Sequence, residues 1–173
     1  MILTASRPSE ALNAPWDEFD LDEGIWTVPA TRMKAKKKHV VMLSSAAVDL
    51  LREQQRVVTG DLIFPGRGGS RMSYDTFTKA PARVGIDAAN AHGWRSTFCA
   101  WASGKIPPDL VEHALAHALA PVMAAYKRDT SPEALRDMME RYAAWLVDDG
   151  AARVVVFPRK AFEPAALISL PML

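Results

Sequence analysis

Hydrophobic and polar positions follow two different periods along this chain, and together they predict a mixed fold. Residues 25–28 (Ile-Trp-Thr-Val) and 39–43 (His-Val-Val-Met-Leu) are β-branched or aromatic runs of the kind found in strands. A basic segment separates them, so the simplest interpretation is a β-hairpin tipped by lysines. Apolar positions elsewhere recur at helical spacing. The pattern favours an α+β fold that is mainly α-helical, with a small antiparallel β-hairpin or sheet.

Capping residues and prolines set the boundaries of the predicted helices. Residues 9–20 predict a short helix that runs into a turn. Ser44 or Ser45 caps a second helix, which fades near Gly60, and Ser73 caps a third, which Pro81 kinks or shortens before Val84. In the second helix, we expect three side chains to face inward: Val48, Leu50 and Leu51.

The chain is almost wholly helical from His92 onward in this interpretation. Several prolines fall where the first residue of a helix tolerates a missing N–H. The predicted helices are 92–103, 108–119, 121–128 and 132–147. After Gly150 the periodicity is lost. We therefore expect one domain over 1–149 and a C-terminal tail over 150–173.

Composition excludes some classes of protein. The chain has 173 residues, of which 49% are hydrophobic and 24% charged, as in an ordinary globular domain. No signal-peptide pattern is present, and no apolar run approaches the roughly 18 to 20 residues that span a bilayer. The single Cys99 fits a reducing compartment. We expect a cytoplasmic protein with no membrane role.

Charge is distributed unevenly, although the formal net charge is only +1. An acidic stretch at 17–23 is followed by a basic run at 32–39, on the predicted hairpin tip. Such a run is either a solvated tip or a surface that reaches a phosphate backbone, and charge alone favours neither. The candidates for contact with DNA are Arg32, Lys36, Lys37 and Lys38.

Two pairs of residues could carry chemistry. His92 and Arg95 lie three positions apart at a helix start, where they would share one face near the positive end of the helix dipole. His117 and Tyr126 lie on either side of Pro121, so a turn could direct both into one pocket. Each residue alone would more often be a solvated or buried structural residue. Only the combination suggests a site.

A zinc site is the main alternative for the histidines. His113 and His117 are four positions apart, as two ligands on one helix face would be. The zinc-protease motif needs Glu directly after the first histidine, whereas this chain has Ala114 there, and no third ligand has a recognisable spacing. We therefore expect no metal and no other cofactor.

Taken together, these residues resemble the catalytic domain of the tyrosine recombinases, the phage-integrase family, over about residues 1–149. The stretches 16–22 and 138–146 resemble prophage and genomic-island integrases in particular. The stretches that carry the wider resemblance are 4–12, 33–43, 91–98, 115–117 and 124–126.

The resemblance implies site-specific DNA recombination or integration by strand cleavage and rejoining. Tyr126 would attack a phosphodiester and form a 3′-phosphotyrosine intermediate, leaving a 5′-hydroxyl. Arg7 and Arg95 would hold the non-bridging oxygens of the scissile phosphate, because their planar forks suit bidentate contact.

The remaining roles concern proton transfer. By the same resemblance, His92 would assist the nucleophile and His117 would donate to a phosphate oxygen. Lys34 would protonate the departing 5′-oxygen, although a shift of hairpin register could give that role to a neighbouring lysine. The implied partners are double-stranded DNA and other recombinase protomers. The full-length protein would assemble with them as a tetrameric synapse. Its implied location is the nucleoid. No small-molecule substrate is implied.

One departure from the family pattern lies at the N-terminus, because only six residues precede Arg7. The family's first catalytic-domain helices and its N-terminal DNA-binding domain would be lacking, so we expect a truncated integrase. The competing hypothesis is an inactive remnant with a weak DNA-binding or protomer-association role. A type IB topoisomerase shares the chemistry, but the integrase-like flanking stretches favour the recombinase.

Overall fold

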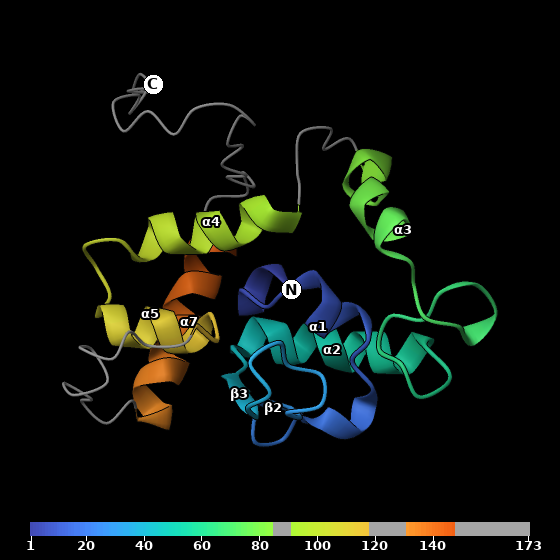
Figure 1. The fold of residues 1–173 in the computed structure, drawn as a ribbon, viewed down its shortest axis with the longest axis horizontal. Helices are drawn as coiled ribbons and strands as arrows, with labels where there is room; N and C mark the ends of the chain where they lie inside the picture. Colours follow the sequence, from blue (N-terminus) through green and yellow to red (C-terminus); the bar gives the residue numbers. More distant parts are fainter. Residues whose placement is uncertain (85–90, 118–130, 148–173) are drawn as a thin grey trace.

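The structure is a computed structural model that describes residues 1–84, 91–117 and 131–147 (Figure 1). The predicted helix at 121–128 and the predicted tail at 150–173 lie outside the described residues. The mainly helical α+β fold predicted from the sequence is confirmed. Among the described residues, none of the helices is long and apolar enough to cross a membrane.

A three-stranded antiparallel sheet, in the order β1-β2-β3, underlies the N-terminal half. Its strands are β1 (Phe19–Asp20), β2 (Ile25–Val28) and β3 (His39–Met42). Trp26 pairs with Val41, and the hairpin between β2 and β3 is the predicted one. Strand β1 was not predicted, because two residues are too few to show an alternating pattern.

Two of the helices begin at serines that the capping signals indicated. The Ser44 hydroxyl accepts a hydrogen bond from the Ala47 N–H at 3.3 Å, and Ser73 accepts one from Thr76 at 3.1 Å, so both predicted caps are confirmed. The α-helices are α1 (Pro8–Leu12), α2 (Ser45–Val57), α3 (Tyr74–Lys79), α4 (Ala91–Ala102), α5 (Pro108–Ala114) and α7 (Pro132–Val147). The 3-10 turns are η1 (Ile2–Thr4), η2 (Trp16–Glu18), η3 (Arg67–Gly69) and η4 (Pro81–Val84).

Pro81 shortens the third predicted helix, as expected: α3 ends before Pro81, and the chain continues as the 3-10 turn η4. Two details differ from the sequence-based prediction. Helix α5 ends at Ala114 instead of near 119, because Ala116 adopts a left-handed conformation with φ of 50°. Leu50 was expected to face inward, but it is 51% exposed, while Leu51 is buried.

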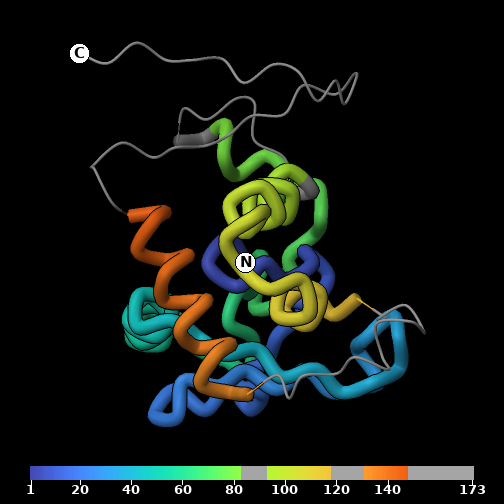
Figure 2. The backbone as a smooth tube through the Cα atoms, turned by 90° about the vertical axis from the view of Figure 1, so that its left-hand side faces the viewer, coloured from blue at the N-terminus to red at the C-terminus, as the bar shows by residue number. Residues whose placement is uncertain are grey.

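Within the described residues, two apolar clusters make up the core. One contains Phe98 of α4, Leu115 at the end of α5 and Tyr142 of α7. The other contains Trp26 of β2 and Ile63. Helix α7 contacts η1, α2, α5 and β3 and so joins the two halves. In Figure 2, α4 and α5 are seen nearly end-on with α7 beside them. The segment from η1 to α1 lies where α4, α5 and the sheet half meet, which brings it next to residues far along the chain.

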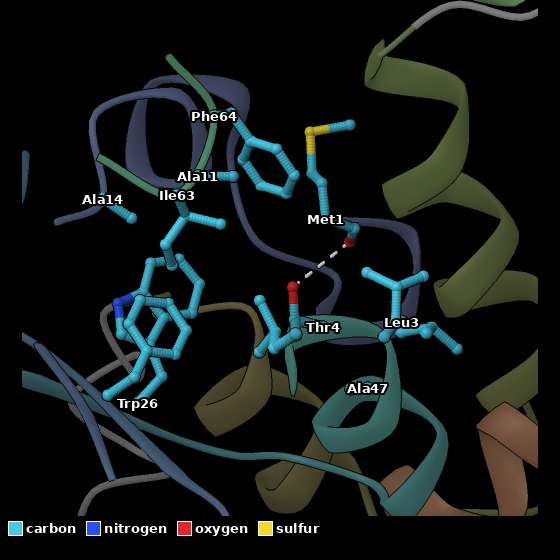
Figure 3. A pocket seen from close by; sticks show the side chains of 12 residues that line it. Met1, Leu3, Thr4, Ala11, Ala14, Trp26, Ala47, Ile63 and Phe64 are labelled. Carbon is cyan, nitrogen blue, oxygen red and sulfur yellow. Dashed lines mark hydrogen bonds between the residues drawn. The ribbon is translucent and has the colours of Figure 1, made fainter. Parts of the chain in front are cut away.

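A small apolar cavity of about 50 Å³ lies within the sheet half, between η1, α1 and α2 (Figure 3). Leu3, Trp26, Ile63 and Phe64 are among its lining residues. Its one drawn polar contact is the 3.3 Å hydrogen bond from the Thr4 hydroxyl to the Met1 carbonyl. A cavity of this size and polarity suits packing and not chemistry. The residues with reactive side chains lie elsewhere.

Candidate functional site

Arg7 is held in place by a buried carboxylate one helical turn away. It is the N-cap of α1, and its backbone N–H donates to Glu10 Oε2 at 2.8 Å while its Nη1 donates to Glu10 Oε1 at 2.9 Å. The Glu10 side chain is 4% exposed, whereas that of Arg7 is 28% exposed. Because both carboxylate oxygens of Glu10 bind Arg7, the guanidinium is oriented but still reaches solvent.

Arg95 projects from α4 onto two main-chain carbonyl groups. Its guanidinium donates to the carbonyl of Ala5 and, through Nη2, to the carbonyl of Leu115 at 2.8 Å. Burial lowers the pKa of Arg95, and the neighbouring positive charge of Arg7 lowers it further. The two arginines therefore lie close enough to repel each other. Two half-buried cations at one place form a site for an anion, which would relieve that repulsion.

His117 lies beside Arg95, just after the end of α5. Its Nε2 is 3.2 Å from Arg95 Nη2, and its Nδ1 is 2.9 Å from Glu112 Oε2. The His117 side chain is 43% exposed, so it lies at the solvent edge of the site. The structure thus brings together three of the six predicted catalytic residues, from α1, α4 and the turn after α5.

The other predicted catalytic residues are placed less completely. His92 belongs to the first turn of α4, but its side chain lies outside the described part of the chain. Tyr126 also lies outside the described residues. Lys34 is exposed in the hairpin, directly after the buried Met33. The catalytic roles of all six residues stay predictions.

The basic hairpin divides into an exposed tip and inward-facing ends. Lys36, Lys37 and Lys38 are exposed, and Lys36 has a φ of 51° in the tip. Arg32 instead donates to the Glu18 carboxylate and to the Glu10 carbonyl. Because Arg32 binds acceptors within the protein, we do not include it in the proposed DNA contact.

His39, at the other end of the basic run, is 8% exposed and does not belong to the charged tip. Burial, followed by the neighbouring His113, lowers its pKa to about 4, so its ring is neutral near neutrality. The His39 and His113 rings have centroids 5.7 Å apart. His113 therefore lies against β3, whereas His117 lies against Arg95. The described residues include no group of three or more His, Cys, Asp or Glu side chains arranged to hold a metal ion.

Sequence reasoning missed two acidic residues at this site. Glu10 lies three positions after Arg7, the capping-box spacing, and that spacing could have identified it. Glu112 lies five positions before His117, and its contact with that ring depends on how α5 ends. In each case a carboxylate orients a predicted catalytic side chain.

This chain is similar in sequence and in fold to known proteins. The model of the phage integrase family matches residues 1–133. The prophage integrase IntZ of Escherichia coli (strain K12) is 37% identical over 148 residues, which are 83% of this chain and 37% of the relative. The chain thus spans little more than a third of that relative's length.

Solved recombinase structures have the same fold. The XerA recombinase superposes with a TM-score of 0.58 and 21% identity, covering 82% of this chain and 55% of that chain. The XerH site-specific recombinase superposes with a TM-score of 0.51 and 25% identity, covering 73% of this chain and 40% of that chain. Because the family model matches most of its length and a prophage integrase is 37% identical to it, the chain belongs to the phage integrase family of tyrosine recombinases.

Proposed function

We propose that this chain is the catalytic part of a site-specific recombinase that cuts and rejoins double-stranded DNA through a 3′-phosphotyrosine. The observation that carries the proposal is the meeting of Arg7, Arg95 and His117 at one solvent-accessible place. Residues 1–149 would form the catalytic domain, and residues 150–173 a tail.

The arginines would bind the scissile phosphate. A phosphodiester has two non-bridging oxygens, and two guanidinium groups can each present paired donors to them. In the transition state negative charge accumulates on those oxygens, so fixed cations stabilise it more than the ground state. His117, which lies next to Arg95, would donate to the same phosphate when its Nε2 is protonated. These contacts would supply charge stabilisation from side chains alone.

Cleavage itself would depend on residues beyond this cluster. The Tyr126 oxygen would form a bond to phosphorus while the bond from phosphorus to the 5′-oxygen breaks. The phenolic proton would leave with help from His92, and Lys34 would give a proton to the 5′-oxygen. Rejoining would reverse these steps, with a 5′-hydroxyl displacing the tyrosine. Because the phosphotyrosine retains the free energy of the cleaved phosphate ester, rejoining requires no external energy source.

DNA would lie across the site and the hairpin tip. Lys36, Lys37 and Lys38 are exposed and can approach phosphates without rearrangement of the core. The similar XerH recombinase was solved bound to its difH substrate, which supports DNA as the partner here. Recombination joins two duplexes, so it would also require further protomers, assembled as a tetrameric synapse.

A covalent-trapping assay tests the proposal. The protein would be mixed with a pool of duplexes of many sequences, each with a nick in one strand. Cleavage near the nick releases a short piece that carries the 5′-hydroxyl and diffuses away. Because rejoining then lacks its 5′-hydroxyl, the protein stays attached to DNA. We expect an adduct with the unsubstituted chain. Arg95→Ala should reduce its rate by about a hundredfold or more, as when a donor to a developing charge is removed. Arg141→Ala is the matched control, since Arg141 is exposed on α7.

The outcomes separate the two hypotheses for this chain. An adduct that is lost in Arg95→Ala and retained in Arg141→Ala supports the recombinase. If the unsubstituted protein forms no adduct at any concentration while it still binds DNA, the proposal fails and the inactive remnant is favoured. Relaxation of supercoiled DNA without preference for sequence would instead favour a topoisomerase.

A further inference from the structure

The end of α5 fixes the position of His117 through the main chain. Ala116 N–H donates to the His113 carbonyl at 2.9 Å, and His117 N–H donates to the Glu112 carbonyl at 3.0 Å. Together with the left-handed Ala116, these bonds form the Schellman pattern that closes many helices. His117 is therefore anchored by its backbone to the same residue, Glu112, that its ring contacts.

The two side-chain contacts of His117 also fix where its proton lies. An arginine guanidinium can only donate hydrogen bonds, so Nε2, which lies 3.2 Å from Arg95 Nη2, must accept. An ionised carboxylate can only accept, so Nδ1, which lies 2.9 Å from Glu112 Oε2, must carry the proton. These two contacts match the tautomer that carries its proton on Nδ1.

We propose that Glu112 is a positioning residue that holds His117 as the Nδ1–H tautomer and orients its Nε2 toward the phosphate site. This inference rests on the proposed function. When a phosphate oxygen occupies the place between Arg95 and His117, it accepts from Arg95 and from a protonated Nε2. The carboxylate of Glu112 then stabilises the ring cation from the other side, as an orienting acid does for a catalytic histidine.

The surrounding charges make this support necessary. Arg95 contacts the ring directly, and Arg7 lies close to Arg95, so the ring has positive charge on one side. Glu10 also faces the arginines, but both its oxygens bind Arg7. Among the described side chains, Glu112 is the carboxylate whose hydrogen bond reaches the imidazole. Without it, we expect the ring to rotate or change tautomer.

The test combines a spectroscopic measurement with a rate measurement. Nitrogen-15 NMR of the full chain reports which ring nitrogen of His117 carries the proton. We expect Nδ1–H in the unsubstituted chain and in Glu112→Gln, whose amide oxygen can still accept. Glu112→Ala should show the Nε2–H tautomer in a substantial fraction. Asp109→Ala, on the same helix, is the matched control and should match the unsubstituted chain.

In the covalent-trapping assay, Glu112→Ala should slow adduct formation at saturating DNA by about tenfold or more, with DNA affinity little changed. Glu112→Gln should restore much of the rate. Two results overturn the inference: an unchanged Nδ1–H tautomer in Glu112→Ala, or equal slowing by Glu112→Ala and Asp109→Ala. The NMR measurement needs no cleavage, so it decides the inference even where the chain forms no adduct and the proposed function fails.

Discussion

The Arg95 guanidinium binds the main-chain carbonyl of Ala5, a residue 90 positions earlier in the chain and two before Arg7. Ala5 has a φ of 48°, in the left-handed region that costs a non-glycine residue about 1 kcal/mol. This bond attaches the second arginine of the site to the peptide that carries the first. Their relative position is therefore set by the fold before any DNA is bound, as preorganised charge stabilisation requires.

Glu10 should matter for stability because it is buried and holds Arg7. Glu10→Gln removes the charge that pairs with Arg7 and replaces one acceptor oxygen with a donor group. We expect a loss of about 1 to 3 kcal/mol in the free energy of unfolding, measured with urea. Asp22→Asn removes an ion pair whose acid is 94% exposed and should leave the unfolding midpoint nearly unchanged. An equal loss in the free energy of unfolding for the two substitutions would show that the buried Glu10 pair stabilises the protein no more than an exposed ion pair does.

The left-handed conformation of Ala116 predicts a substitution that raises the free energy of unfolding. Ala116→Gly should stabilise the protein by about 0.5 kcal/mol or more, because glycine adopts this conformation without the steric cost. Ala100→Gly, at an exposed position inside α4, should instead destabilise it by about 1 kcal/mol. Thermal unfolding of both variants checks the pair. A lower melting temperature for Ala116→Gly would contradict the account of how α5 ends.

His39 makes stability depend on pH. Its pKa is lowered from 6.5 to about 4 in the folded state, first by burial and then by His113. The unfolded chain therefore binds the proton at a higher pH than the folded chain. Stability falls as pH drops from 6.5 towards 4, by up to about 3 kcal/mol from this residue.

Urea unfolding at about pH 7 and about pH 5 measures this dependence. His39→Gln should flatten it, while Glu10, Arg7 and His113, which also face this ring, stay in place. An unchanged slope in His39→Gln would mean that other groups account for the acid sensitivity.

The hairpin lysines can be tested through the salt dependence of DNA binding. Each phosphate contact contributes about 0.9 to the slope of log affinity against log salt concentration. Lys37→Ala should weaken binding and reduce that slope by about 1. Arg56→Ala removes the same charge from the exposed end of α2 and should change neither quantity. If the two variants behave alike, the hairpin has no specific contact with DNA.

The sequence predicted those parts of the fold that depend on local signals. The hairpin, the serine caps of α2 and α3, and the starts of α5 and α7 at Pro108 and Pro132 follow from residue types within a few positions of each other. The end of α5 did not, because Ala116 adopts a conformation that is usual for glycine, and nothing in the local sequence marks it. Leu50 was misassigned because the helical pattern does not show which of two adjacent leucines faces the core: Leu51 is buried, whereas Leu50 is 51% exposed.

The site was predicted from residue identity, whereas its supporting contacts were not. Arg7, Arg95 and His117 come together as expected from the family resemblance. The groups that hold these side chains could not be predicted in the same way. Arg95 binds main-chain carbonyls, which no side-chain pattern can reveal. The inward orientation of Arg32 likewise depends on Glu18, which lies 14 positions earlier.

The most direct test of the central claim is to locate the covalent bond between protein and DNA. The adduct from the trapping assay would be digested with nuclease and protease and sequenced by mass spectrometry. We expect a nucleotide joined through its 3′-phosphate to Tyr126, and no adduct from Tyr126→Phe. The control Tyr74→Phe, at a tyrosine on α3 that is 59% exposed, should still react. A bond to any other residue, or an adduct that persists in Tyr126→Phe, would contradict the central claim.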